Sequence, residues 1–277
     1  MSLEAAVAHA AGRAVRSLRR VGGGDINDAY AAELEDGGRA FVKTRADVPA
    51  GEYAAEAAGL RWLAVPNGVG VPKVLGASDE VLVLEWLEPG AAGAEAELGR
   101  SLAWVHAAGA DGFGADAPAR IGPLVLPNDP LPDWPSFYAE RRLRPLLAPA
   151  RDGGSLSAGG VRAVEAVCDR IGELAGPPEP PARLHGDLWG GNVLWSGGRP
   201  YVIDPIAYGG HREVDLAMLR LFGAPGPRLM AAYEDVAPLA DGHEERVALY
   251  QLFPLLVHAV LFGGGYGSSV ERAAGRY

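Results

Sequence analysis

The segment His185-Gly-Asp-Leu-Trp-Gly-Gly-Asn192, together with Asp204 twelve residues later, constrains this chain more than any other feature. An aspartate and an asparagine five residues apart are followed by an apolar stretch, a turn at Gly197-Gly198 and a second apolar stretch that ends at Asp204. A polar loop between two short strands would explain any one of these residues alone. The joint pattern instead predicts a phosphoryl-transfer site, because that chemistry needs a base and oxygen ligands for metal ions.

Three side chains of this pattern have predicted chemical roles. Asp187 is the candidate base that accepts the proton of the acceptor hydroxyl, and Asn192 and Asp204 are the candidate Mg²⁺ ligands. His185 is expected to brace the loop. Trp189, beside the base, is equally compatible with core packing and with a flat wall for a sugar ring.

Composition excludes several other classes of site. The 277 residues include 35 acidic and 25 basic side chains, a net charge of −10, which argues against duplex nucleic acid or an anionic membrane as a partner. The single cysteine, Cys168, excludes an intramolecular disulfide and a cysteine zinc site, and its neighbours place it on the buried face of a helix.

Two segments bear on cellular location. Residues 1–20 contain an early glutamate and no continuous apolar stretch, so we expect an amphipathic helix and not a signal peptide. The stretch 247–262 is interrupted by Gln251, Pro254 and His258, which favours a buried helix over a membrane span. A cytoplasmic protein is the expectation.

The order of elements predicts an α+β protein with a two-lobed, protein-kinase-like fold. Residues 1–87 contain a helix, a hairpin that turns at 36–38, a second helix at 51–64 and two further strands. Residues 88–277 are mostly helical, with helices expected at 94–108, 135–147, 159–174, 213–221, 228–233 and 244–262 and an irregular, proline-rich excursion at 111–135. We therefore expect a small β-rich N-lobe with one key helix, which ends in a hinge, and a larger helical C-lobe that carries the catalytic loop.

The N-lobe contains candidate groups for binding ATP. Lys43 follows two apolar residues in the returning strand of the hairpin, where its ammonium can reach phosphates if a carboxylate holds it. Glu56 in the following helix is the predicted partner, in preference to Glu52 one turn earlier.

Backbone groups are expected to complete the nucleotide site. Gly22, Gly23 and Gly24 precede the first strand of the hairpin and would let backbone N–H groups approach phosphates, although they lack the G-x-G-x-x-G spacing. Glu85, Trp86 and Leu87 lie at the junction of the lobes and are placed for backbone hydrogen bonds to adenine.

A second polar cluster, His211-Arg-Glu-Val-Asp215, begins a C-lobe helix. Asp215 is expected to accept hydrogen bonds from the backbone of the catalytic loop. His211 and Glu213 are assigned to acceptor binding or to support of that loop. His106, on an earlier helix, is interpreted as a packed core histidine.

Several motifs together resemble the fructosamine kinase/ketosamine kinase family, whose members have an aminoglycoside-phosphotransferase-like kinase fold. They are HGDLWGGN (185–192), DPIAYGGHREVDLAM (204–218), LFG (221–223), LYQLFPLLVH (249–258), FGGGY (262–266), GGDIN (23–27), VKT (42–44) and EAAGL (56–60). The resemblance covers nearly the whole chain. It implies ATP- and Mg²⁺-dependent phosphorylation of the 3-hydroxyl of ketosamines, which are sugar adducts on small amines or on proteins. Phosphorylation makes the adduct unstable and so repairs the glycated amine.

Two alternative functions remain compatible with the residues. A small-molecule kinase of another acceptor, such as an aminoglycoside or an amino alcohol, would share the same Asp, Asn and Asp pattern. A nucleotide-binding pseudokinase is the alternative outside enzymes, but such proteins usually lack the base, the lysine or a metal ligand, and all are present here. The natural ketosamine, the choice between free and protein-bound acceptors and the oligomeric state, with a monomer as one option, stay open.

Overall fold

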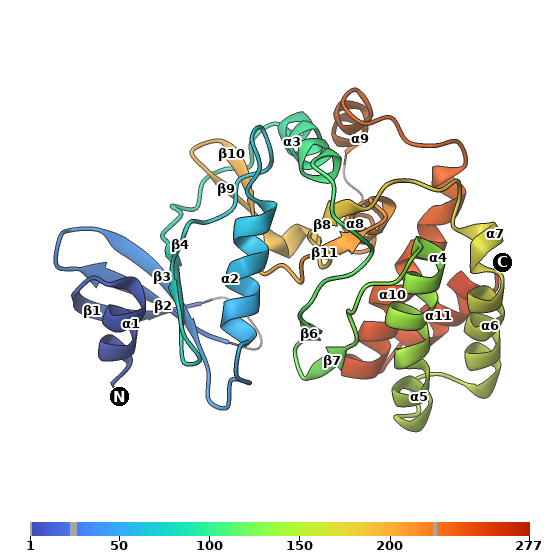
Figure 1. The fold of residues 1–277 in the computed structure, drawn as a ribbon, viewed down its shortest axis with the longest axis horizontal. Helices are drawn as coiled ribbons and strands as arrows, with labels where there is room; N and C mark the ends of the chain where they lie inside the picture. Colours follow the sequence, from blue (N-terminus) through green and yellow to red (C-terminus); the bar gives the residue numbers. More distant parts are fainter. Residues whose placement is uncertain (1, 23–26, 224–225) are drawn as a thin grey trace.

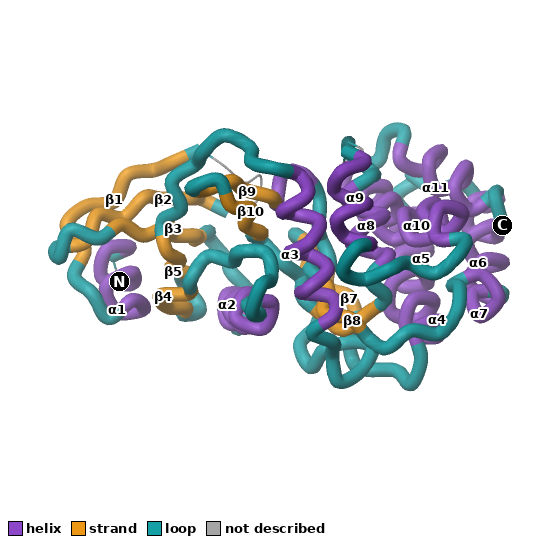
Figure 2. The backbone as a smooth tube through the Cα atoms, turned by 90° about the horizontal axis from the view of Figure 1, so that it is seen from above, coloured by secondary structure: helices purple, strands orange, loops and turns teal. Residues whose placement is uncertain are grey.

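The computed structural model describes residues 2–22, 27–223 and 226–277. Strands gather at one end of the elongated molecule and helices at the other, and the two termini lie at opposite ends (Figures 1 and 2). The strand-rich end contains an antiparallel sheet with the order β1-β2-β3-β5-β4. Its elements are α1 (Leu3–Ala11), β1 (Val15–Val21), β2 (Asp28–Leu34), β3 (Arg39–Thr44), α2 (Glu52–Leu63), β4 (Val74–Ala77) and β5 (Leu82–Glu85).

Strand β3 lies in the middle of this sheet and carries Lys43. The hairpin turns at 36–38 as predicted, and Lys43 pairs with Ala29 of β2 on one side and with Leu82 of β5 on the other. Pairing on both sides fixes the backbone of β3. The lysine therefore projects from a rigid part of the sheet.

The N-terminal segment differs from the expected helix over residues 1–20. Ser2 caps α1 by accepting a hydrogen bond from the Ala5 N–H, but the helix ends at Ala11. Gly12 has φ +64°, a left-handed conformation that commonly ends helices. The following residues form β1, an edge strand with exposed arginines, whose charges disfavour pairing with another chain. The sequence pattern did not reveal this change from helix to strand, because the side chains of an edge strand and of an exposed helix face are both polar.

Helix α2 packs one face against the sheet. Tyr53, Ala57 and Leu60 are buried and form a cluster with Leu82 and Leu84 of β5. Apolar residues at this spacing are typical of a helix that covers a sheet on one side. The opposite face of α2 contacts the C-lobe at Gly59. A side chain there would crowd this contact, because a Cβ at residue 59 would lie 3.1 Å from the Cβ of Ala207.

The rest of the chain is mostly helical and also contains short strand pairs. Its helices are α3 (Glu95–Ala107), α4 (Trp134–Phe137), the π-helix η1 (Tyr138–Leu143), α5 (Arg144–Asp152), α6 (Ala158–Asp169), α7 (Ile171–Leu174), the 3₁₀-helix η2 (Gly190–Asn192), α8 (Glu213–Leu219), α9 (Pro227–Glu234), α10 (His243–Phe262) and α11 (Tyr266–Ala274). The strand pairs are β6 (Ala119–Ile121) with β7 (Leu124–Leu126), β8 (Ala182–Leu184) with β11 (Tyr208–Gly210), and β9 (Val193–Ser196) with β10 (Arg199–Val202).

Helix α10 is the central element of the helical core. Leu249, Leu252 and Leu256 are fully buried, and the helix packs against α11, α8 and α5. Its length and apolar composition would suffice to cross a membrane, but 61% of the relevant window is buried inside the protein. The prediction that 247–262 forms a buried helix is confirmed.

Some predicted helices are divided in the structure. The helix expected at 135–147 is split into α4, η1 and α5, and the helix expected at 159–174 is interrupted at Arg170 between α6 and α7. The proline-rich excursion 111–135 contains the short hairpin β6–β7. Helix α11 was not predicted, although Val270 on it is fully buried.

Contacts between the two ends hold the catalytic segment against the sheet-bearing half. Gly70 forms a parallel bridge with Tyr201 of β10, and Arg183 of β8 donates to the Trp62 carbonyl at 2.6 Å. Strand β5 ends at Glu85 and α3 begins at Glu95, so the expected division after residue 87 falls in the connection between them. That division stays a prediction.

Candidate active site

The predicted catalytic loop leaves β8 and passes through η2 into β9. Gly186 has φ +85°, and a Cβ there would lie 2.8 Å from the Ile206 Cγ1 and 2.9 Å from the Tyr208 Cε1. Only glycine fits this left-handed, crowded position. The turn at Gly186 therefore determines where Asp187 leaves the strand.

His185 braces the loop, as predicted. Its Nε2 lies 2.8 Å from the carbonyl oxygen of Ile203, and its Nδ1 lies 3.3 Å from the backbone nitrogen of Asp187. A carbonyl can only accept, so Nε2 carries the proton and Nδ1 accepts from the Asp187 N–H. One ring thus connects the candidate base to the residue before Asp204.

Asn192 lies against Asp187. Its Nδ2 donates to the Asp187 carbonyl oxygen at 2.8 Å and lies 3.3 Å from the Asp187 carboxylate. Burial raises the pKa of Asp187, and the hydrogen bond from Asn192 opposes this rise. A buried carboxylate with a raised pKa is a better proton acceptor than an ordinary aspartate.

Asp204 has an unusual backbone conformation. Its φ is +58°, which is uncommon for a residue other than glycine and is often found at functional sites. Its Oδ1 accepts a hydrogen bond from the Lys43 Nζ at 2.9 Å, while its side chain remains 42% exposed. The carboxylate therefore faces accessible space beside Lys43.

The predicted ion pair between Lys43 and Glu56 is present. The Lys43 Nζ lies 2.9 and 3.0 Å from the two carboxylate oxygens of Glu56. Glu52 instead holds Arg45 through two hydrogen bonds of 2.6 and 2.8 Å, so the choice of Glu56 over Glu52 is confirmed. Burial lowers the pKa of Lys43, but the charges of Glu56 and Asp204 outweigh burial and raise it above its ordinary value.

Asp215 contacts the catalytic loop as predicted. Its Oδ2 accepts from the His185 N–H at 2.7 Å, and its Oδ1 accepts from the Gly186 N–H at 2.9 Å. His106, which was expected only to pack in the core, lies with its Nε2 3.3 Å from the Asp215 Oδ2 and its Nδ1 2.8 Å from the Tyr233 hydroxyl. Helical periodicity predicted burial of His106 but could not identify partners on other helices.

Trp189 lies on the surface of the site. Its indole is 39% exposed, covers Gly191 and makes an edge contact with Phe222 at a centroid distance of 6.0 Å. Phe222 in turn lies 4.9 Å from the ring of His258 on α10. Phe222 and His258 were not selected from the sequence as site residues, because helix α10 and the loop after α8 meet only in the folded chain.

His211 and Glu213 are buried inside the helical half. The imidazole of His211 stacks on Tyr250, and burial lowers its pKa to about 4. Both carboxylate oxygens of Glu213 accept from Arg246, at 2.7 and 2.9 Å. These contacts fit a supporting role, whereas acceptor binding by Glu213 is not supported because its carboxylate is already paired.

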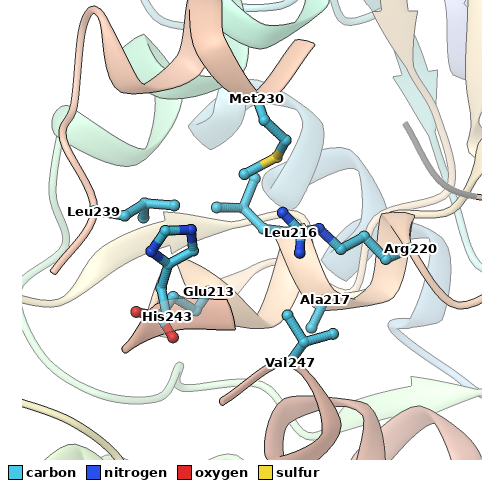
Figure 3. A pocket seen from close by; sticks show the side chains of 8 residues that line it. All are labelled: Glu213, Leu216, Ala217, Arg220, Met230, Leu239, His243 and Val247. Carbon is cyan, nitrogen blue, oxygen red and sulfur yellow. The ribbon is translucent and has the colours of Figure 1, made fainter. Parts of the chain in front are cut away.

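Glu213 also lines a small hollow between α8, α9 and α10 (Figure 3). The lining side chains are Glu213, Leu216, Ala217, Arg220, Met230, Leu239, His243 and Val247. Its volume is about 10 Å³, which suits a single water molecule and is too small for a sugar. The hollow is therefore a packing feature and not an acceptor pocket.

Only some of the residues expected to contact the nucleotide lie in the described part of the chain. Gly22 is exposed at the end of β1, and Gly23 and Gly24 lie outside the described residues. The Glu85 N–H donates to the carbonyl of Lys73, the residue before β4, so this N–H is already paired. The Trp86 indole N–H donates to Glu88.

The candidate metal ligands fit a hard cation such as Mg²⁺. Asn192 uses its amide nitrogen toward Asp187, which turns the amide oxygen away, and Asp204 keeps one carboxylate oxygen beyond its bond to Lys43. Carboxylate and amide oxygens are the ligands that Mg²⁺ prefers, with phosphate and water completing its shell.

Comparison with known proteins identifies the family. The fructosamine kinase family model matches residues 2–277. The chain belongs to the fructosamine kinase family. A probable ketoamine kinase of Thermus thermophilus is 39% identical over 91% of this chain and 90% of its own. A protein-ribulosamine 3-kinase of Arabidopsis thaliana is 34% identical over 92% of this chain and 80% of its own.

Solved structures agree with this membership and confirm the predicted fold class. The crystal structure of a candidate fructosamine-3-kinase from Thermobifida fusca has a TM-score of 0.93 and 48% identity, covering 99% of this chain and 98% of that one. An aminoglycoside phosphotransferase in complex with AMP-PNP and hygromycin B has a TM-score of 0.62 at 18% identity, with 100% and 96% covered, which shows the kinase-like fold alone. This fructosamine kinase family member is a phosphotransferase.

Proposed function

We propose that this protein is an ATP-dependent kinase that phosphorylates the 3-hydroxyl of ketosamines and thereby starts the removal of sugar adducts from amines. Two findings support the proposal: membership of the fructosamine kinase family over residues 2–277, and the arrangement of Lys43, Glu56, Asp187, Asn192 and Asp204 around one site. The arrangement is the observation that carries it, because a pseudokinase usually lacks one of these groups.

Asp187 is proposed to accept the proton of the ketosamine hydroxyl as that oxygen attacks the γ-phosphorus of ATP. The oxygen–phosphorus bond to the acceptor forms while the bond to ADP breaks, and the hydroxyl proton moves to the Asp187 carboxylate. Burial, which raises the pKa of Asp187, makes the carboxylate more basic. The hydrogen bond that the Asp187 N–H donates to His185 and the one that the Asp187 carbonyl oxygen accepts from Asn192 hold the residue in place.

Lys43 is proposed to bind the phosphates of ATP while Glu56 holds its ammonium. Asn192 and Asp204 would hold Mg²⁺, which supplies positive charge to the transferred phosphoryl group. The Lys43 ammonium binds two carboxylates, those of Glu56 and Asp204, at 2.9 Å each. These contacts hold Asp204 in position before a nucleotide arrives. The backbone of residues 85–87 is the proposed contact for adenine.

Trp189 is proposed as the wall of the acceptor site. Its indole is packed against Gly191 and Phe222 yet remains 39% exposed, so packing and sugar stacking can both occur. A ketosamine on a small amine or on a protein would present its sugar to this surface. The relative from Arabidopsis named as a protein-ribulosamine 3-kinase supports the ketosamine class.

A panel of acceptors tests the proposal. Purified protein is mixed with Mg·ATP and, in separate reactions, with a fructosamine, a ribulosamine, an aminoglycoside and choline, and ADP release is followed. We expect turnover with a ketosamine and phosphate at the sugar 3-position by NMR. Turnover only with the aminoglycoside or choline would assign a different acceptor class. Binding of Mg·ATP without turnover of any acceptor would favour the pseudokinase alternative.

A further inference from the structure

Exposed aromatic side chains gather beside the proposed acceptor wall. Within the described ranges, the exposed large apolar side chains are Trp104, Val125, Trp189, Phe222 and Phe262. Three of these five, Trp189, Phe222 and Phe262, belong to one connected group of rings. Single apolar side chains on a surface are ordinary, whereas a contiguous exposed group is typical of a binding site. The clustering therefore calls for a ligand.

The rings of this group contact one another in sequence. The Trp189 and Phe222 centroids lie 6.0 Å apart, and Phe222 lies 4.9 Å from His258. His258 in turn lies 5.4 Å from Phe262, at the end of α10, and 5.0 Å from Tyr266, at the beginning of α11. We call these five rings the aromatic strip. Exposure rises along it from 39% at Trp189 to 66% at Phe262.

His258 fixes the middle of the aromatic strip. Its Nδ1 lies 2.7 Å from the Pro254 carbonyl oxygen on the same helix, and a carbonyl can only accept, so the ring donates this hydrogen bond. Phe222, Phe262 and Tyr266 all pack around the ring that is held in this way. A surface that is already ordered loses little side-chain entropy when a ligand binds. The aromatic strip is thus a preformed surface.

The covalent structure of a ketosamine indicates what can lie on this surface. Trp189 is two residues after Asp187, so a sugar whose hydroxyl faces Asp187 lies at one end of the aromatic strip. One nitrogen joins that sugar to the carrier, by which we mean the group on the amine. The nitrogen is a secondary amine that carries a proton near neutral pH, and aromatic faces attract such cations. Phe222, which contacts Trp189, is the next surface for the carrier.

We infer that the aromatic strip is a subsite for the carrier and selects ketosamines whose carrier is apolar, an aromatic or alkyl group, over those with a small or acidic one. The inference rests on the proposed function, since it extends the acceptor site of that reaction. An apolar carrier would lose contact with water against Phe222 and Phe262. A carboxylate would instead meet the negative faces of the rings.

Two ketosamines that differ only in the carrier test the inference. The fructose adducts of benzylamine and of methylamine carry the same charge and differ by a phenyl ring. The wild-type protein should have a KM about 10-fold lower for the benzylamine adduct, the low end of what burying a phenyl ring can give. Phe262→Ala should raise that KM about fivefold. It should leave the KM of the methylamine adduct within twofold.

Two further variants at the same position sharpen the test. Phe262→Leu keeps an apolar side chain and should retain most of the preference for the benzylamine adduct. Phe262→Arg places a cation at the far end of the aromatic strip and should lower the KM of the fructose adduct of glutamate. Equal KM values for the benzylamine and methylamine adducts in the wild type, or an unchanged preference in Phe262→Ala, would overturn the inference.

Trp104→Ala is the control for losing an exposed aromatic side chain. Trp104 is 45% exposed on α3 and lies outside the aromatic strip, so both KM values should stay unchanged. Size-exclusion chromatography of Phe262→Ala examines a second copy of the chain as the occupant. A variant that changed only from dimer to monomer, with both KM values kept, would assign the aromatic strip to contact between copies and overturn the inference.

Binding without turnover separates this inference from the proposed function. If the wild-type protein phosphorylated neither adduct, the proposed function would fail. Calorimetric titration of the benzylamine adduct into the wild type and Phe262→Ala would still decide the role of the aromatic strip. A Kd about fivefold higher in the variant would support the subsite. Equal Kd values, or no binding to either protein, would overturn it.

Discussion

Replacing Glu56 by glutamine removes the charge that holds Lys43 and leaves the shape of helix α2 unchanged. The Lys43 ammonium would lose its two bonds to a carboxylate, of 2.9 and 3.0 Å, and would keep its bond of 2.9 Å to Asp204. Because Asp204 remains as a partner, the free energy of unfolding should fall by about 1.5–3 kcal/mol, the range for hydrogen bonds to charged groups. This loss is smaller than the roughly 3–5 kcal/mol expected when a buried charge is left without any partner.

The same change should weaken nucleotide binding. With Glu56 neutral, Lys43 is attracted toward Asp204, away from the phosphates and onto a proposed metal ligand. A loss of about 1.5–3 kcal/mol corresponds to a roughly 10- to 100-fold rise in the Kd of Mg·ATP. Isothermal titration calorimetry measures this Kd, and urea unfolding measures the stability.

Glu52→Gln is a matched control for this experiment. Glu52 lies one turn earlier on the same helix, its side chain is 16% exposed against 14% for Glu56, and it also holds a cation through two bonds. It should lose comparable stability but retain the Kd of Mg·ATP within about twofold, as expected for a site outside the nucleotide contact. Equal weakening by both substitutions, or greater weakening by Glu52→Gln, would refute the role of the Lys43–Glu56 pair.

The remaining predictions concern the base, the metal and the acceptor. Asp187→Asn should lower kcat by about 10²-fold or more, measured by ADP release; retention of half the wild-type kcat would contradict a base role. The same variant should melt no lower than wild type at pH 7, because the raised pKa of Asp187 means that its ionised form is disfavoured in the folded state and asparagine removes that charge; a clear drop in melting temperature would contradict this reasoning. The acid limb of kcat/KM should fall as pH decreases through the raised pKa of Asp187, and so at higher pH than for an ordinary aspartate; a profile flat down to the ordinary carboxylate range would argue against it. Asp204→Ala should weaken Mg·ATP binding more than Asn192→Ala, because it removes a charged ligand; calorimetry showing wild-type affinity for Asp204→Ala would exclude Asp204 as the ligand. Trp189→Ala should raise KM for the ketosamine and leave KM for ATP unchanged, whereas a lowered melting temperature with unchanged acceptor KM would indicate packing alone.

Residue spacing and the order of elements were sufficient to predict the parts of the site that lie close together in sequence. The span from Asp187 to Asn192 folds as one loop, so its spacing directly reports geometry. Lys43 and Glu56 could be paired because a strand followed by the next helix brings them together. The contact of Asp215 with the catalytic loop was also predicted. The short strand pair β8–β11 brings the beginning of α8 close to that loop.

Groups that meet only through tertiary packing were not predictable in the same way. His106 and Asp215 are 109 residues apart, and nothing in the helical pattern of α3 indicates which helix will face it. The change from α1 to β1 was missed because the edge strand has no apolar alternation of its own and gains its structure from pairing with β2. The partner of Glu213 could not be predicted for a related reason, since Arg246 comes from α10.

Gly59 lets helix α2, which carries Glu56, lie close to the segment that follows Asp204. Glycine inside a helix costs about 1 kcal/mol relative to alanine, so local propensity favours alanine at this position. An added methyl would lie 3.1 Å from the Ala207 methyl, so α2 or the segment that follows Asp204 would have to give by a few tenths of an ångström. Replacing Gly59 by alanine would therefore set a gain in helix propensity against the close approach of α2 to the segment beside the active site.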